Sequence, residues 1–147
     1  MKILLINGPN LNNLGTREPA IYGSLTLNDI EARVSDKAAS MNIDILSFQA
    51  NDEGEIVDFL QSNSSAASGI IINAGALTHY GLSMRDALQA TELPIIEVHI
   101  SNIYAREEFR HHSVIADIAV GQISGLGWRG YMVALDFMSE SIKEQKE

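Results

Sequence analysis

Five short apolar runs with helical stretches between them are the feature that most constrains the fold. They occupy residues 3–6, 43–46, 70–72, 95–98 and 118–120. Most are continuously hydrophobic rather than alternating, which is typical of parallel strands covered on both faces. Strands that alternate with helices in this way predict an α/β fold. We expect a three-layer sandwich around a five-stranded parallel sheet with strand order 2-1-3-4-5.

Three of the intervening helices have clear sequence signals. Thr26 with Asp29, and Asp52 with Glu55, resemble capping pairs at the starts of two helices. A third helix carries an apolar stripe with Trp, Tyr and Met over residues 128–142. Large apolar side chains at helical spacing indicate a packing face rather than a cofactor site.

The length predicts one domain. A chain of 147 residues can bury a substantial core but is too short for two ordinary domains. We therefore expect a single domain over residues 1–147, in which the polar tail 139–147 either extends the last helix or frays.

Charge and composition exclude several classes of partner. The formal net charge is −9, and no long basic run is present, so nucleic acid and anionic membranes are poor partners. No stretch approaches the roughly 18 apolar residues of a membrane span. The chain has no cysteine, which excludes a thiol nucleophile and favours a cytoplasmic setting. A small anionic substrate held by a few local arginines remains compatible with this charge.

Three loops carry most of the unusual polar residues. They follow the first, third and fourth predicted strands and span residues 7–23, 73–79 and 99–102. In open parallel sheets, ligands bind beyond the carboxyl ends of the strands, where the strand order reverses. We expect these loops to meet there and form the site. The stretch 14–23 is Gly- and Pro-rich and long for a simple connection, which predicts a lid.

The residue inventory narrows the chemistry. None of the four lysines lies on these loops, which argues against an imine mechanism. No serine-hydrolase elbow, Walker loop or dinucleotide fingerprint is present. The histidines lack the spacing of common metal motifs, so no metal site is expected. His79 and His99 on converging loops favour acid–base work, and Arg17 would favour the ionised form of a nearby Tyr22 phenol.

The motifs taken together resemble type II dehydroquinase (3-dehydroquinate dehydratase). They read LLINGPNLN (4–12), GTREP (15–19), YG (22–23), EVHISN (97–102), ARE (105–107) and FRHHS (109–113). The resemblance covers nearly the whole chain. It implies a flavodoxin-like fold, a homododecamer built from trimers, and dehydration of 3-dehydroquinate to 3-dehydroshikimate without metal or organic cofactor.

The resemblance also implies roles for individual residues. Tyr22 would be the base that removes the proton on C2, and Arg17 would keep it ionised and stabilise negative charge. Asn10 would help to hold a water against the enolate oxygen. His99 would protonate the departing C1 hydroxyl. Glu97 either orients His99 from the same strand face or is a structural buried acid.

Further residues match the family's substrate contacts. These are Asn73, His79, Arg110, the Ile100–Ser101 main chain and, from a neighbouring subunit, Asp86. The family commonly has Pro where Ala74 stands, and often an aromatic residue where Leu77 stands. Loss of the proline would loosen the loop that presents Asn73, which bears on affinity more than on reaction type.

The sequence leaves two other hypotheses for the function open. A flavodoxin-like domain could bind a nucleotide or flavin phosphate at the same edge of the sheet. However, a phosphate site does not need the set formed by Arg17, Tyr22 and His99. An inactive scaffold is opposed by the presence of every matched catalytic residue. For an active dehydratase, the reaction would serve either aromatic biosynthesis through the shikimate pathway or quinate breakdown.

Overall fold

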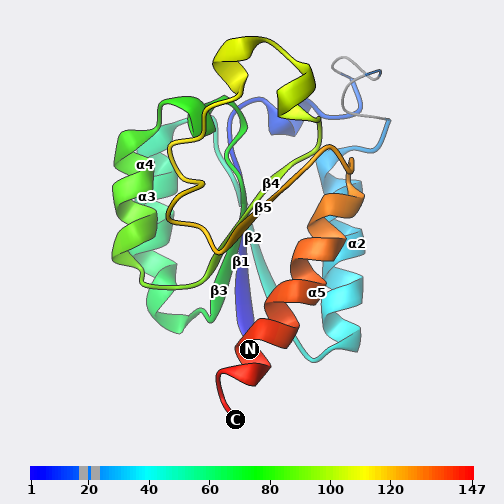
Figure 1. Ribbon diagram of the computed structural model, residues 1–147. Coiled ribbons are helices and arrows are strands. Elements are labelled where there is room, and N and C mark those ends of the chain that lie inside the picture. The colour runs from blue at the N-terminus through cyan, green and yellow to red at the C-terminus, as the bar shows by residue number, and fades with distance from the viewer. Residues whose placement is uncertain (17–19, 21–23) are drawn as a thin grey trace.

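The protein is a three-layer sandwich around a parallel sheet (Figure 1), seen in a computed structural model that describes residues 1–16, 20 and 24–147. The sheet has five strands in the order β2-β1-β3-β4-β5, as the sequence predicts. Their bounds are β1 Lys2–Asn7, β2 Asp44–Gln49, β3 Gly69–Asn73, β4 Ile95–His99 and β5 Gly121–Ser124.

Helices cover both faces of the sheet. The α-helices are α2 Leu27–Ser40, α3 Glu53–Asn63, α4 Leu82–Ala90 and α5 Arg129–Glu144. Short 3-10 helices are η1 Leu11–Asn13, η2 Ser64–Ala66, η3 Gly75–His79, η4 Ile103–Ala105 and η5 Glu108–Arg110. In Figure 1, α2 and α5 lie on one face, and α3 and α4 lie on the other. Among the described helices, none is long and apolar enough to cross a membrane.

The central strands are buried on both faces, which explains their continuous apolar sequence. In β1, Ile3 and Leu5 pack into the core beneath α2 and α5, whereas Leu4 and Ile6 pack into the core beneath α3 and α4. All four side chains are fully buried. Burial of this kind contributes on the order of 2 kcal/mol per large aliphatic side chain.

The two predicted helix caps are present. Thr26 Oγ1 accepts from the Asp29 N–H at 3.1 Å, and Asp29 Oδ2 accepts from the Thr26 N–H at 3.0 Å. This reciprocal pair fixes the start of α2. The Asp52 side chain accepts from the N–H groups of Gly54 and Glu55, at 2.7 and 3.3 Å, and so begins α3.

The fifth strand is present, but its predicted position, residues 118–120, was wrong. Residues 118–120 form a turn, and the strand begins only at Gly121. Val120 is 57% exposed, so its apolar character does not reflect burial in the sheet. The true strand, β5, pairs with β4 at one edge of the sheet and is half-buried, so its residues are partly polar. The polar tail extends the last helix, since α5 continues to Glu144 and buries Ile142.

Candidate active site

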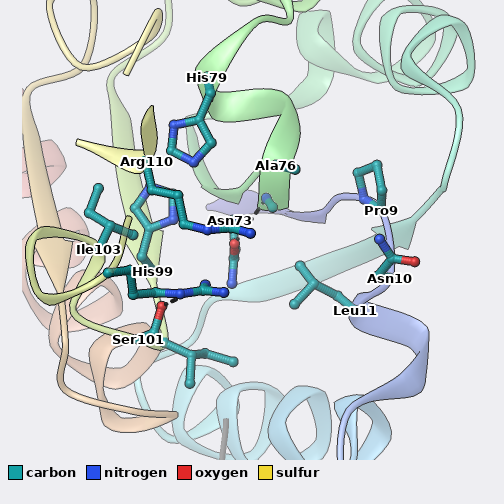
Figure 2. A pocket seen from close by; sticks show the side chains of 13 residues that line it. Pro9, Asn10, Leu11, Asn73, Ala76, His79, His99, Ser101, Ile103 and Arg110 are labelled. Atoms are coloured by element: carbon teal, nitrogen blue, oxygen red, sulfur yellow. Dashed lines mark hydrogen bonds between the residues drawn. The ribbon is translucent and has the colours of Figure 1, made fainter. Parts of the chain in front are cut away.

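A cavity of about 250 Å³ lies at the carboxyl edge of the sheet, where the loops after β1, β3 and β4 meet (Figure 2). The sequence predicts this convergence. Seven predicted site residues line the cavity: Asn10, Asn73, His79, His99, Ile100, Ser101 and Arg110. The remaining lining residues are Pro9, Leu11, Gly75, Ala76, Ile103 and Arg106. In the view of Figure 2, Asn73 lies between the histidines on one side and Asn10 on the other.

The loops after β1 and β3 pack main chain against main chain. The Gly8 N–H donates to the Asn73 carbonyl at 2.8 Å. A Cβ at Gly8 would lie 2.2 Å from the Ala74 carbonyl oxygen, so only glycine allows this approach. On the other loop, Gly75 has a φ of +60°, and its missing Cβ would lie 2.9 Å from the Pro9 oxygen. The walls of the cavity therefore depend on two glycines.

Asn10 is held by the end of β2. Its φ is 68°, in the left-handed region that Asn tolerates better than most residues. Its main-chain N–H donates to Asn51 Oδ1 at 3.0 Å. Gln49 Nε2 donates to the same Asn51 oxygen at 3.1 Å and to the Gly8 carbonyl at 3.2 Å. These bonds fix the backbone that presents Asn10 to the cavity.

Asn73, at the end of β3, is anchored from beneath. Its Oδ1 accepts from the Gly75 N–H at 3.1 Å, and its Nδ2 donates to Tyr131 Oη at 2.9 Å. The Tyr131 hydroxyl in turn donates to Asn7 Oδ1 at 2.6 Å. Burial raises the pKa of Tyr131 well above its usual value, although the bond from Asn73 opposes this. The phenol therefore stays protonated.

His79 is neutral and directed by the main chain. Burial lowers the pKa of His79, and its electrostatic interactions with His99 and Arg110 lower it further, although a bond to the His112 main chain opposes them. Its Nδ1 lies 2.7 Å from the His112 carbonyl oxygen. A carbonyl can only accept, so Nδ1 carries the proton of the neutral ring and Nε2 is an acceptor.

Glu97 and His99 lie on the same face of β4, as their spacing predicts. Glu97 is fully buried, and His99 is 5% exposed. Three side chains donate to the Glu97 carboxylate: Ser113 at 2.5 Å, and at close range Thr78 and Gln122. Burial by itself would raise the pKa of Glu97, but His99 and the hydroxyls of Ser113 and Thr78 outweigh it and lower the value to about 2. The carboxylate is therefore ionised.

The His99 ring rests against this carboxylate. Its Nε2 is buried and lies 3.5 Å from Glu97 Oε1, with no closer hydrogen-bond acceptor in the described part of the chain. Nε2 thus faces Glu97, and Nδ1 is the ring nitrogen left for a ligand. An imidazole backed by a carboxylate can donate a proton and have its cationic form stabilised.

Two guanidinium groups, those of Arg106 and Arg110, line the cavity of this acidic protein, and both lie near Glu107. Arg110 Nε donates to Glu107 Oε2 at 2.7 Å, and its guanidinium lies 5.0 Å from the Phe109 ring centroid. Arg106 Nη1 donates to Ser101 Oγ at 3.4 Å. Sequence analysis missed Arg106, although it lies in the ARE motif four residues before Arg110. Such groups suit a carboxylate ligand.

Other predicted residues lie elsewhere. Asp86 is exposed on α4 and does not line the cavity. Arg17 and Tyr22 lie outside the described residues, as does most of the predicted lid. Ala74 and Leu77, which depart from the family pattern, are both buried. The described residues contain no group of three or more His, Cys, Asp or Glu that could hold a metal ion.

Comparisons with known proteins agree with one another. The family model described as Dehydroquinase class II matches residues 1–139. The chain is 59% identical to a 3-dehydroquinate dehydratase of Roseiflexus castenholzii over 94% of this chain and 88% of the relative. It is 51% identical to a catabolic 3-dehydroquinase of Verticillium alfalfae over 97% of this chain and 95% of the relative. The solved type II dehydroquinase of Propionibacterium acnes has a TM-score of 0.91 at 42% identity, over 95% of this chain and 96% of that one.

Proposed function

The chain belongs to the class II dehydroquinase family and is a hydro-lyase that dehydrates 3-dehydroquinate, and we propose that its cavity performs this reaction through an enolate. In this proposal Tyr22 is the general base and His99 the general acid. The observation that most supports it is the pairing of His99 with the buried, ionised Glu97 at a cavity that also contains two guanidinium groups.

The substrate is an anion with ring hydroxyls, and the lining groups suit both features. The Asn73 amide, the guanidinium of Arg110 and the main-chain N–H groups of Ile100 and Ser101 are donors for the carboxylate and hydroxyl oxygens. His79 Nε2, as the acceptor of a neutral ring, can receive a hydrogen bond from a ring hydroxyl. These contacts would hold the ring with its C1 hydroxyl towards His99.

Proton removal begins the reaction. Tyr22, as phenolate, takes the proton from C2, which is acidic because C2 lies next to the C3 ketone. The electron pair of the broken C–H bond moves into the C2–C3 bond, and negative charge collects on the C3 oxygen. Arg17 and a water held by Asn10 would stabilise this enolate, because preorganised donors act most strongly where charge develops.

Loss of water completes the reaction. His99 Nδ1 gives its proton to the C1 hydroxyl while the enolate re-forms the ketone. The C1–O bond breaks, water leaves, and a C1–C2 double bond forms. Glu97 acts from behind the ring, where its charge holds His99 in one orientation and stabilises its protonated form.

The same proposal covers the oligomeric state of the protein and its cellular compartment. A homododecamer built from trimers in the cytoplasm would let Asp86, exposed on α4, reach the cavity of a neighbouring subunit. The reaction would serve aromatic biosynthesis or quinate breakdown.

Ultraviolet absorbance tests the activity directly. The product has a double bond conjugated with its ketone and absorbs, whereas the substrate does not. We expect the absorbance to increase with time when the purified protein is mixed with 3-dehydroquinate. With the His99→Ala variant, we expect no increase. A folded wild-type protein that gives no increase would contradict the proposal.

A further inference from the structure

Three polar side chains from three separate elements meet below the cavity floor. Asn7 ends β1, Asn73 ends β3, and Tyr131 lies in the first turns of α5. Asn7 and Asn73 are direct partners in the register of the two strands. The Tyr131 hydroxyl lies between them, donating to Asn7 Oδ1 at 2.6 Å and accepting from Asn73 Nδ2 at 2.9 Å. Of the three, only Asn73 lines the cavity.

The arrangement fixes which way the Asn73 amide faces. Its oxygen accepts from the Gly75 N–H at 3.1 Å, and one of its two N–H hydrogens goes to Tyr131. The second N–H hydrogen is then the group left for a ligand. Turning the amide over would set its oxygen against the Tyr131 oxygen, whose hydrogen already goes to Asn7. It would also set its NH₂ group against the Gly75 N–H. Two contacts therefore oppose the flipped state.

The phenol is itself held in one state. Tyr131 is fully buried, and burial raises its pKa, so the hydroxyl keeps its hydrogen throughout the working range of an enzyme. Asn7, also fully buried, receives that hydrogen. With its hydrogen given to Asn7, the phenol oxygen is left to accept the hydrogen bond from Asn73. A phenylalanine would fill the same space in the core but could not do this.

We propose that Tyr131 is a positioning residue for substrate binding, which holds the Asn73 amide with one N–H directed to the substrate. The inference rests on the proposed function in that it takes Asn73 to contact 3-dehydroquinate. Tyr131 would act on affinity, because the proton transfers assigned to Tyr22 and His99 do not pass through Asn73.

The Tyr131→Phe variant tests this in steady-state kinetics of the purified enzyme. It leaves Asn7 Oδ1 and Asn73 Nδ2 without their partner, so only the Gly75 N–H still holds the Asn73 amide in place. We expect KM to rise about ten-fold, the effect of losing one good hydrogen bond, with kcat within about two-fold of wild type. The pH values at which kcat/KM changes should not move. An unchanged KM would overturn the inference.

A matched variant separates positioning from simple destabilisation. Met138→Ala opens a hole at a fully buried position of the same helix, where Met138 packs against Gly69 rather than the cavity. We expect it to lower the unfolding midpoint at least as much as Tyr131→Phe, yet to leave KM unchanged. If both variants raise KM in proportion to their loss of stability, Tyr131 is only a packing residue and the inference fails.

A double variant shows whether the effect passes through Asn73. In an Asn73→Ala background, adding Tyr131→Phe should change KM by less than two-fold, because the amide to be held is absent. An additional ten-fold rise would contradict the inference. Should Tyr131→Phe not fold, Asn7→Ala replaces it: it keeps the phenol but removes the acceptor of its hydrogen, and KM should again rise. Absence of turnover by the wild-type enzyme would instead contradict the proposed function.

Discussion

Glu97 Oε1 lies 3.5 Å from His99 Nε2, on one face of β4, so a fully buried carboxylate stands directly behind the imidazole that lines the cavity. Three donors from other elements hold that carboxylate: Thr78, Ser113 and Gln122. A buried charge is costly unless it is paired and fully hydrogen-bonded. The three hydrogen bonds to Glu97 meet this requirement directly beside His99, which is the proton donor of the proposed reaction.

The first prediction concerns acid stability. The folded pKa of Glu97, about 2, lies below its ordinary value of 4.5, so ionisation stabilises the fold above pH 4.5. This contribution, on the order of 3 kcal/mol, is lost as the pH falls from 4.5 towards 2. Urea unfolding of wild type and Glu97→Gln should therefore give free energies that converge on acidification. A difference that stays constant with pH would contradict the assigned state of Glu97.

The second prediction concerns catalytic roles. Tyr22→Phe, Arg17→Ala and His99→Ala should each lower kcat by about 100-fold or more, because acid–base and charge-stabilising groups act in the transition state. His112→Ala is the control, since the hydrogen bond between His79 and His112 uses the main-chain carbonyl of His112, which the variant keeps. Near-normal turnover by Tyr22→Phe, measured by product absorbance, would show that another group is the base.

The third prediction concerns reaction class. Activity should survive chelators, and it should survive borohydride added with substrate. An imine needs a lysine at the site, and no lysine lines the described cavity. Lys2 begins β1 at the opposite end from the site, and Lys37 is paired with Asp136 at 2.6 Å. Inactivation by borohydride only when substrate is present would reveal an imine and refute the enolate route.

The fourth prediction concerns assembly. If Asp86 completes a neighbour's cavity, Asp86→Ala and Tyr22→Phe subunits should each be inactive alone. Mixed and reassembled, they should regain part of the activity, because some cavities then take Tyr22 from one chain and Asp86 from another. Mass measurement of the mixture verifies that hybrids have formed. Verified hybrids without activity would mean that each site is made within one chain.

The fifth prediction concerns Ala74. Its φ of −74° suits proline, and the preceding Asn73 is extended, as a residue before proline must be. Ala74→Pro should therefore raise the free energy of unfolding by about 0.4–1 kcal/mol, since it restricts the unfolded chain. KM should fall slightly because Asn73 is presented by a stiffer loop. Urea titration and kinetics check both, and a lower stability would show that the proline ring does not fit beside Gly8.

The sequence predicts the sheet well where strands are buried on both faces. The three central strands β1, β3 and β4 carry that signal, and the polar loops at their carboxyl ends form the cavity as expected. The two edge strands are covered less: β2 still includes an apolar run, whereas β5 has the sequence GQIS and gives no such signal. In β5, Gln122 holds Glu97 and the Ser124 hydroxyl donates to the Ser101 carbonyl, so both serve the site and are polar.

The supporting residues of the site were beyond sequence reasoning. Thr78 and Gln122 lie 19 and 25 residues from Glu97 and belong to other elements. Tyr131 lies 58 residues from Asn73, within a stripe predicted to pack. That prediction is right for the ring, which is buried, but spacing does not indicate where a hydroxyl at its tip will bond. Such contacts depend on which strand ends become neighbours.

The glycine contact between the loops after β1 and β3 has a consequence for engineering. Because Gly8 meets Ala74 through main-chain atoms, this contact between the two loops does not depend on the size of the side chains that line the cavity. Ile103, a large apolar residue of the cavity lining, could then be replaced by a smaller one while this contact stays in place. The cavity is thus suited to redesign towards bulkier ring acids, one lining position at a time, provided Gly8 is left untouched.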